Sequence, residues 1–243
     1  MFKSQAHRIT LALSVLMCVA CGQVPEPGLP LTIKTAADVD AYAGLTVRDG
    51  NLSIVNTDIE GLSSLSGLRE VNGDVVIVNN ERLDSLSGLD QLEVIRGNLI
   101  IDGNSQLVSL SGLANLRLVE GIVFILGNTS LEALIGLESL ESVRSLQICG
   151  NPALGNVEAL RNLSVVEGTL AFASNPRLTS LHGLGNVTQI GALTFSGNHS
   201  VASLAPLGPF EVIDGDVSIK FNSALADLSA LDGVKHIGGY LSL

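Results

Sequence analysis

Residues 73–95 read GDVVIVNNERLDSLSGLDQLEVI, and the pattern returns as GNLIIDGNSQLVSLSGLANLRLV at 97–119 and GIVFILGNTSLEALIGLESLESV at 121–143. The start moves by 24 residues each time. Further copies begin at Gly50, Gly168, Gly191 and Gly215, one near Ser145 has serine in place of glycine, and GGYLSL at 238–243 begins another. A repeat of this length predicts a solenoid, because one unit cannot bury its own apolar face and must stack on its neighbours.

Each repeat opens with two apolar residues separated by one position, such as Val75 and Ile77 or Leu99 and Ile101. This spacing of two predicts a short strand with both side chains pointing inward. Apolar residues then recur every three positions, which fits 3₁₀-like coils better than an α-helix or a strand. We therefore predict a mainly β fold, a right-handed parallel β-helix or leucine-rich-repeat-like solenoid of about eight turns.

An asparagine follows the predicted strand in every turn. Stacked asparagines carry both donors and acceptors, so they can satisfy backbone groups at one corner of each turn. We predict a structural column of Asn56, Asn80, Asn104, Asn128, Asn151, Asn175, Asn198 and Asn222.

The combined pattern GxLxIxxNxxLxxLxGLxxLxxIxG resembles the receptor L domain, over about residues 45–243. The resemblance implies a leucine-rich-repeat-like β-helix and recognition of a protein or a glycan. The stretch TAADVDAYAGLTVRDGNLSI resembles the short entry helix of that family, with Thr35 and Asp38 as its N-terminal cap. Leu45 stands where the family often has cysteine, so the entry disulfide is not expected. We assign residues 32–47 to an N-terminal cap and 48–243 to the solenoid, which can be incomplete at its C-terminus.

The first 30 residues have the pattern of an export signal and a tether. A short basic region precedes the apolar stretch ITLALSVLMCVA, which is too short to span a bilayer comfortably. Residues 1–20 resemble a bacterial lipoprotein signal, which implies lipidation of Cys21; the alternative is ordinary secretion with an unmodified thiol. Residues 21–31 are rich in proline and glycine and predict an extended tether. By resemblance, Gly22 indicates the outer membrane.

Charge and cysteine content narrow the possible partners. The net charge of −11 disfavours nucleic acid, because an acidic surface repels phosphate. After Cys21 the chain contains only Cys149, which could form an internal disulfide with no cysteine other than that of the anchor. We expect an unstapled domain, that is, one without a disulfide bond that relies on its core for stability. We expect Cys149 to be an inert filler, a small side chain that packs without reacting.

Outward positions of the strands are free to vary, so they can carry function. Turns two to four place five apolar residues there: Val76, Val78, Ile100, Phe124 and Leu126. Such a patch often marks an interaction surface. Two alternatives stay open: the β-propensity of a sheet face, and cover from the N-terminal segment or a partner chain.

The same outward positions offer little for catalysis. They contain one acid, Asp102, and one base, Lys220, five turns apart, whereas polysaccharide-active β-helices need clustered charges. We expect no metal site, no cofactor and no enzyme activity. The sequence predicts a lipid-anchored envelope protein that recognises an unknown protein or glycan, with a passive structural protein as the alternative and a polysaccharide-active enzyme as a weaker one.

Overall fold

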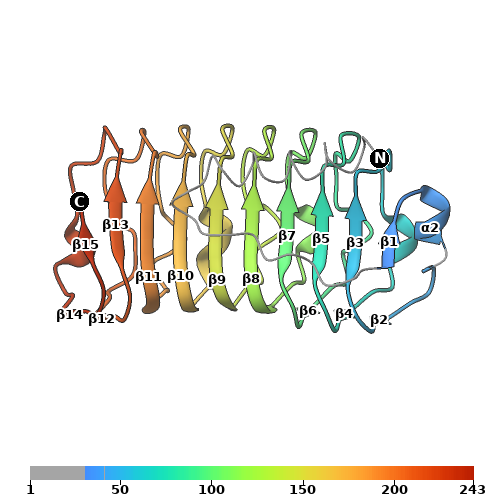
Figure 1. The fold of residues 1–243 in the computed structure, drawn as a ribbon, viewed down its shortest axis with the longest axis horizontal. Helices are drawn as coiled ribbons and strands as arrows, with labels where there is room; N and C mark the ends of the chain where they lie inside the picture. Colours follow the sequence, from blue (N-terminus) through green and yellow to red (C-terminus); the bar gives the residue numbers. More distant parts are fainter. Residues whose placement is uncertain (1–30, 41) are drawn as a thin grey trace, which may run out of the picture.

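The computed structural model describes residues 31–40 and 42–243, and these residues form a parallel β-solenoid with one short helix near its N-terminal end. Its turns stack in sequence order, from β1 at one end to β15 at the other (Figure 1). The predicted signal peptide and most of the predicted tether lie outside the described residues. No helix within residues 31–40 and 42–243 is long and apolar enough to cross a membrane.

One side of the solenoid is a parallel sheet made from one strand of each turn, which we call the main sheet. Its first strands are short and its middle strands are longer because they continue around a bend. The strands are β1 (Leu31–Ile33), β3 (Leu52–Val55), β5 (Val75–Val78), β7 (Leu99–Asp102), β8 (Leu118–Leu126), β9 (Ser142–Cys149), β10 (Val165–Ala173), β11 (Gln189–Ser196), β13 (Val217–Lys220) and β15 (Leu241–Ser242). The register is regular, with Ile77 beside Ile101 and Ile101 beside Ile125.

A second, narrower ladder precedes the main sheet in each turn, and the sequence pattern did not predict it. In the outer turns it consists of two-residue strands, and in β8 to β11 it is continuous with the main strand. The separate strands are β2 (Val47–Arg48), β4 (Glu70–Val71), β6 (Val94–Ile95), β12 (Val212–Ile213) and β14 (His236–Ile237). Pairing shifts register at the bend, for example between Val119 and Ile122.

The third side of the solenoid consists of tight turns and short 3₁₀ helices. These helices are η1 (Ser63–Leu65), η2 (Ser111–Leu113), η3 (Glu158–Asn162) and η4 (Ser229–Leu231). The leucines spaced by three all point into one core; Leu83, Leu86 and Leu89, for example, are fully buried. Backbone hydrogen bonds between residues three apart, such as that from Leu89 N–H to the Leu86 carbonyl at 3.0 Å, explain the spacing, because residues three apart then align on the same side.

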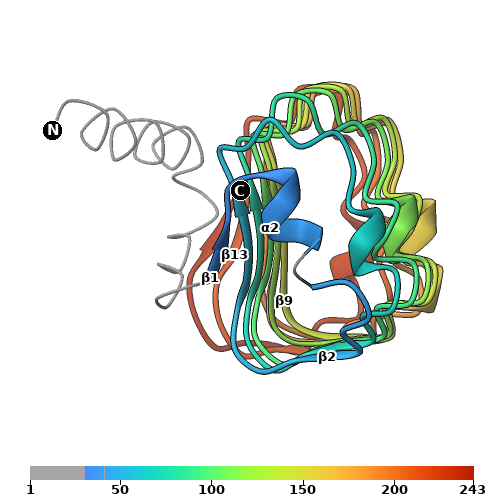
Figure 2. The same cartoon turned by 90° about the vertical axis from the view of Figure 1, so that its right-hand side faces the viewer.

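The two ends of the solenoid differ. Helix α2 (Ala36–Asp40) lies over the N-terminal end of the stack, and its Val39 joins the core (Figure 2). The helix has the predicted cap, because Asp38 accepts from the backbone N–H groups of Lys34 and Thr35 at 2.9 Å. At the other end, the side chains of Leu241 and Leu243 are 55 % and 68 % exposed.

The asparagine column runs through the interior at the end of the main strands. The side chain of Asn104 accepts from the backbone N–H of Asn80 at 3.1 Å and donates to the carbonyl of Ile77 at 2.9 Å. Six of the predicted members are fully buried and bonded in this way: Asn80, Asn104, Asn128, Asn151, Asn175 and Asn198. Asn222 is half-buried, and it accepts from Asn198 at 2.9 Å and donates to Phe195 at 2.8 Å.

The assignment of Asn56 to this column is wrong. Asn56 is exposed and adopts a left-handed backbone conformation with φ of 52°. It therefore corresponds to Asn79 and Gly103, which precede the column asparagine of the next two turns and share this conformation. In the first turn Thr57 occupies the column, and its hydroxyl donates to Asn80 Oδ1 at 2.8 Å. A step of 23 residues separates these positions, so counting by 24 selected the wrong residue.

Candidate functional site

The five predicted face residues lie together on the outer surface of the main sheet. Strand pairing sets Val76 beside Ile100 and Ile100 beside Phe124, while Val78 and Leu126 flank Asp102 in the neighbouring column. They form a cluster that is separate from the solenoid core and also includes Cys149, Ala171 and Ala173. We call the five residues Val76, Val78, Ile100, Phe124 and Leu126 the apolar face.

The apolar face is buried, although it points away from the core. Each of its five side chains is between 2 % and 4 % exposed. In the view along the solenoid, no described helix or strand lies over the outer surface of the main sheet (Figure 2). A sheet surface that carries large apolar side chains is typical of a site that something else covers.

Two polar side chains interrupt the apolar face. Asp102 lies between Val78 and Leu126 in its column and is 4 % exposed. Gln147 lies beside Phe124 and is 8 % exposed, and its Oε1 is a buried acceptor without a hydrogen bond from the part of the chain that the structure describes. A buried acceptor without a donor is costly, so Gln147 favours a bound group that can donate a hydrogen bond to it.

Cys149 is fully buried on the same surface, between Leu126 and Ala173 in its column. It is disulfide-bonded, so the expectations of an unstapled domain and of an inert filler at this position are wrong. Cys149 is the single cysteine within residues 31–40 and 42–243. Spacing along the chain could not reveal this bond, because cysteines far apart in the sequence can pair only if the fold brings them together.

Farther along the main sheet, the two outward columns of side chains, one through Ile100 and one through Asp102, become polar. After Ala171 and Ala173, the outward residues are Thr194, Ser196, Ser218 and Lys220. The first three are half-buried and Lys220 is exposed. The apolar face therefore ends within the molecule, and a polar surface of the same backbone geometry continues it.

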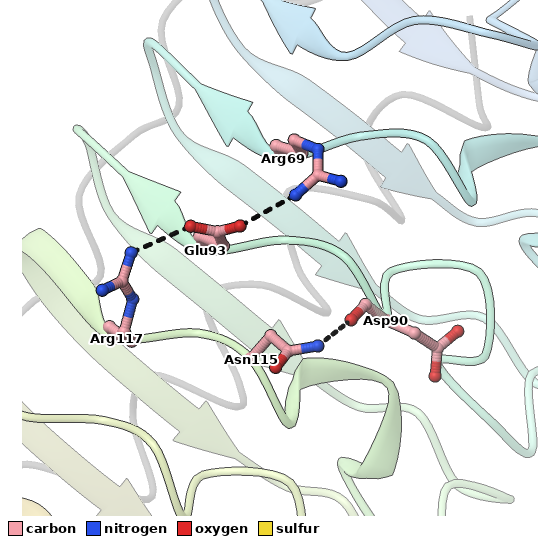
Figure 3. Close-up of polar contacts among 5 residues, drawn as sticks. All are labelled: Arg69, Asp90, Glu93, Asn115 and Arg117. Atoms are coloured by element: carbon pink, nitrogen blue, oxygen red, sulfur yellow. Dashed lines mark hydrogen bonds and ion pairs between the residues drawn. The ribbon is translucent and has the colours of Figure 1, made fainter.

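Other polar side chains form ladders along the corners of the solenoid, away from the apolar face. On one corner, Glu93 bridges Arg69 and Arg117, at 3.0 Å and 2.9 Å (Figure 3). Nearby, Asn115 donates to the backbone carbonyl of Asp90 at 2.6 Å (Figure 3). These contacts join residues of neighbouring turns, so they hold the turns in register. We interpret them as structural contacts, because each group already has a partner within the solenoid.

Chemically reactive groups do not gather on the outer sheet. Asp102 and Lys220 are five strands apart, which is about 24 Å at the usual strand spacing. Residues 31–40 and 42–243 contain no group of three or more histidine, cysteine or acidic side chains that could hold a metal ion. The arrangement is suited to binding through apolar contact and a hydrogen bond to Gln147.

The first turns of the solenoid also match a known family. Residues 46–110 match the family model of the receptor L domain. This stretch covers β2 to β7 and includes three residues of the apolar face, Val76, Val78 and Ile100. The match supports the receptor L domain family for the repeat pattern. No curated protein and no solved structure matches the chain.

Proposed function

We propose that this protein is a non-catalytic recognition module that binds a protein or a glycan through the apolar face. The observation that carries this proposal is a contiguous outward cluster of large apolar side chains, separate from the core, on a sheet whose other half is polar. The solenoid does not need these residues for its own core, because the inward positions already provide Leu, Ile and Val in each turn. The receptor L domain match is consistent with a binding role.

We further propose that the module is exported and held at the bacterial cell envelope by a lipid on Cys21, with the outer membrane as the favoured location and secretion as the alternative. The support is the pattern of the first 30 residues, in which a short apolar stretch ends in small residues before a cysteine. More than one acyl chain on this cysteine would hold the protein stably, whereas a single chain holds only marginally.

A polysaccharide-active enzyme is the weaker candidate, because the outer columns bring no pair of acids within the separations that glycoside hydrolysis requires. A passive envelope protein is the stronger alternative. It would need no apolar face, because β11 and β13 have the same fold with polar side chains on their outer surface.

Photo-cross-linking on intact cells tests the proposal. A photoreactive amino acid is placed at position 100, on the apolar face, and in a matched variant at position 218, in the same column of the polar half. We expect one discrete cross-linked partner from position 100 and none from position 218. Adducts from both positions with the same set of abundant proteins, or from neither, would contradict a recognition role for this face.

A further inference from the structure

We propose that a pocket formed by the end of β13, the corner after it and Leu243 binds a fatty acid. Phe221 would contact the acyl chain and Lys220 the carboxylate. Strands β9, β10 and β11 separate this pocket from the apolar face (Figure 1). The inference is therefore a second binding site, and it does not rest on the proposed function.

The first observation is the backbone conformation of Phe221. Its φ of 56° lies in the left-handed region, which a bulky side chain rarely adopts. In each of the seven turns before it, the position directly before the column residue has the same conformation. Those positions are occupied by Asn56, Asn79, Gly103, Gly127, Gly150, Ser174 and Gly197. The corner therefore does not require phenylalanine, and its backbone conformation disfavours it.

Phe221 also contributes little to the core of the solenoid. It is 77 % exposed, whereas the core phenylalanines Phe172, Phe195 and Phe210 are at most 1 % exposed. An exposed aromatic side chain on a strained backbone adds no evident stability. Strain of this kind clusters at ligand sites, so we infer that Phe221 serves binding.

Phe221 lines a pocket of about 520 Å³. The other lining residues are mostly apolar: Ile219, Leu225, Ala226, Leu228 and Leu243, with Lys220 and Asn222 as the polar ones. This volume and this lining are typical of sites for small molecules with an apolar body. The side chain of Asn222 already accepts from Asn198 and donates to Phe195. Lys220 is therefore the polar side chain that a ligand can engage.

Lys220 indicates the charge of the ligand. It is exposed, and its ammonium group has no ion pair within residues 31–40 and 42–243. A cation beside an apolar pocket favours a molecule that is anionic at one end and apolar along the rest. A carboxylate can accept charge-assisted hydrogen bonds from the ammonium group, while an acyl chain buries apolar surface against Phe221 and the leucines.

Two other ligand classes fit this pocket less well. A glycan would place hydroxyl groups against leucine side chains, where they would lack hydrogen-bond partners. An anionic membrane surface would be repelled by a chain of net charge −11. A fatty acid free in solution meets neither obstacle.

Fluorescence titration of the full chain with 11-dansylaminoundecanoic acid, below its micelle concentration, tests the site. We expect saturable binding by the wild type and at least about tenfold weaker binding by Phe221→Gly, as for the loss of an aromatic anchor. Lys220→Gln should weaken binding of the acid by about tenfold, through the lost charge-assisted hydrogen bond, and leave binding of the methyl ester of the probe unchanged.

A matched control separates binding from folding. Ser174→Gly changes the same left-handed position two turns earlier, and we expect it to bind the probe like the wild type. Glycine adopts this conformation without strain, so Phe221→Gly should unfold in urea at the same midpoint as the wild type or at a higher one. Loss of binding by a variant that is no less stable would assign Phe221 to the ligand.

Several results would overturn the proposal. Absence of saturable binding, equal affinity of wild type and Phe221→Gly, or equal weakening of acid and ester by Lys220→Gln would each do so. A clearly lower urea midpoint for Phe221→Gly would show that the side chain serves the fold. Co-sedimentation with phosphatidylglycerol vesicles without binding of the free probe would show contact with a membrane surface. None of these results bears on the apolar face, which is tested by cross-linking from position 100.

Discussion

The two halves of the main sheet have the same inner surface and different outer surfaces. Inward, Val75 and Ile77 of β5 are matched by Leu193 and Phe195 of β11, and all four are buried. Outward, the β5–β8 half presents the apolar face, whereas Thr194, Ser196 and Ser218 occupy the equivalent positions of the β11–β13 half. Since stacking fixes the inner residues in both halves, the outer difference is not required by the fold.

This difference separates what stabilises the molecule from what it recognises. In a solenoid each turn contacts only its neighbours, so stability is close to a sum of similar contributions. Inner substitutions should therefore have equal effects in both halves, and only outer substitutions should distinguish them.

The largest expected effect comes from glycines at the sharp turn of the third side. Gly136 and Gly183 have φ values of 111° and 114°, and an added Cβ would overlap the carbonyl oxygens of Leu110 and Val157, respectively. We expect Gly136→Ala and Gly183→Ala each to lower the free energy of unfolding by about 3 kcal/mol or more, since both backbone strain and overlap oppose the change. Chemical denaturation monitored by circular dichroism measures this.

The matched control for the glycines is Gly155→Ala. The nearest atom to an added Cβ there is the carbonyl oxygen of Glu132 at 3.8 Å, which is an ordinary contact. We expect a change of about 0.5 kcal/mol or less. A control as damaging as Gly136→Ala would show that glycine loss itself, and not the crowded turn, is responsible.

Substitutions in the asparagine column test whether the two halves of the main sheet contribute equally to stability. Asn104→Ala removes an acceptor for Asn80 N–H and a donor for the Ile77 carbonyl; Asn175→Ala does the same to Asn151 and Ile148. Buried groups left unpaired cost about 1–3 kcal/mol each, so we expect each variant to lose about 3 kcal/mol. Thermal and urea unfolding of the two variants measure the losses, and Asn72→Ala on the surface is the control. Unequal losses would mean that the halves differ inside as well as outside.

The surface ladder should contribute less. Glu93→Gln breaks the ion pairs to Arg69 and Arg117, whose side chains are both 56 % exposed. Solvent screens such pairs, so we expect a loss of at most about 1 kcal/mol that shrinks as salt is added. Urea unfolding at low and at high ionic strength measures it. A loss that does not depend on salt would argue that Glu93 acts through packing.

The smallest expected effect concerns the cap of α2. Backbone hydrogen bonds, first from Lys34 and then from Thr35, lower the pKa of Asp38 below its ordinary value. A carboxyl with a lowered folded-state pKa stabilises fully above its unfolded-state pKa of about 3.9, and the contribution is lost as the pH falls through the folded-state pKa. We expect Asp38→Asn to lower Tm slightly at pH 7 and to converge with the wild type in acid, by calorimetry across that range. A difference that persists in acid would point to a cause other than the charge.

Much of the fold could be predicted because the repeat states the same pattern many times. The main strands, the 3₁₀-like coils, the Thr35–Asp38 cap and the buried asparagines each follow from spacing and local chemistry. The prediction for Asn56 was wrong because one turn is a residue shorter than the others. In addition, the position next to the column has a left-handed backbone conformation, which asparagine also favours. The second ladder was missed because two-residue strands leave too short a pattern.

The site was only partly predictable. Alternation identified which side chains of β5, β7 and β8 point outward, so the apolar face could be named from sequence. The burial of that face, the unpaired Oε1 of Gln147 and the disulfide of Cys149 depend on contacts that the repeat pattern does not determine. A repeat pattern carries no information about such contacts, because they come from outside the repeat.

Partner binding by a matched pair of variants tests the central claim most directly. Phe124 and Thr194 occupy the same outward column, three strands apart, on the two halves of the sheet. The Kd of the cross-linked partner is measured by surface plasmon resonance for protein carrying Phe124→Lys or Thr194→Lys, with circular dichroism to verify folding. We predict at least about tenfold weaker binding for Phe124→Lys, as for the loss of a buried aromatic anchor, and an unchanged Kd for Thr194→Lys. Unchanged binding by a folded Phe124→Lys variant, or equal losses in both, would contradict the claim that the apolar face is the recognition surface.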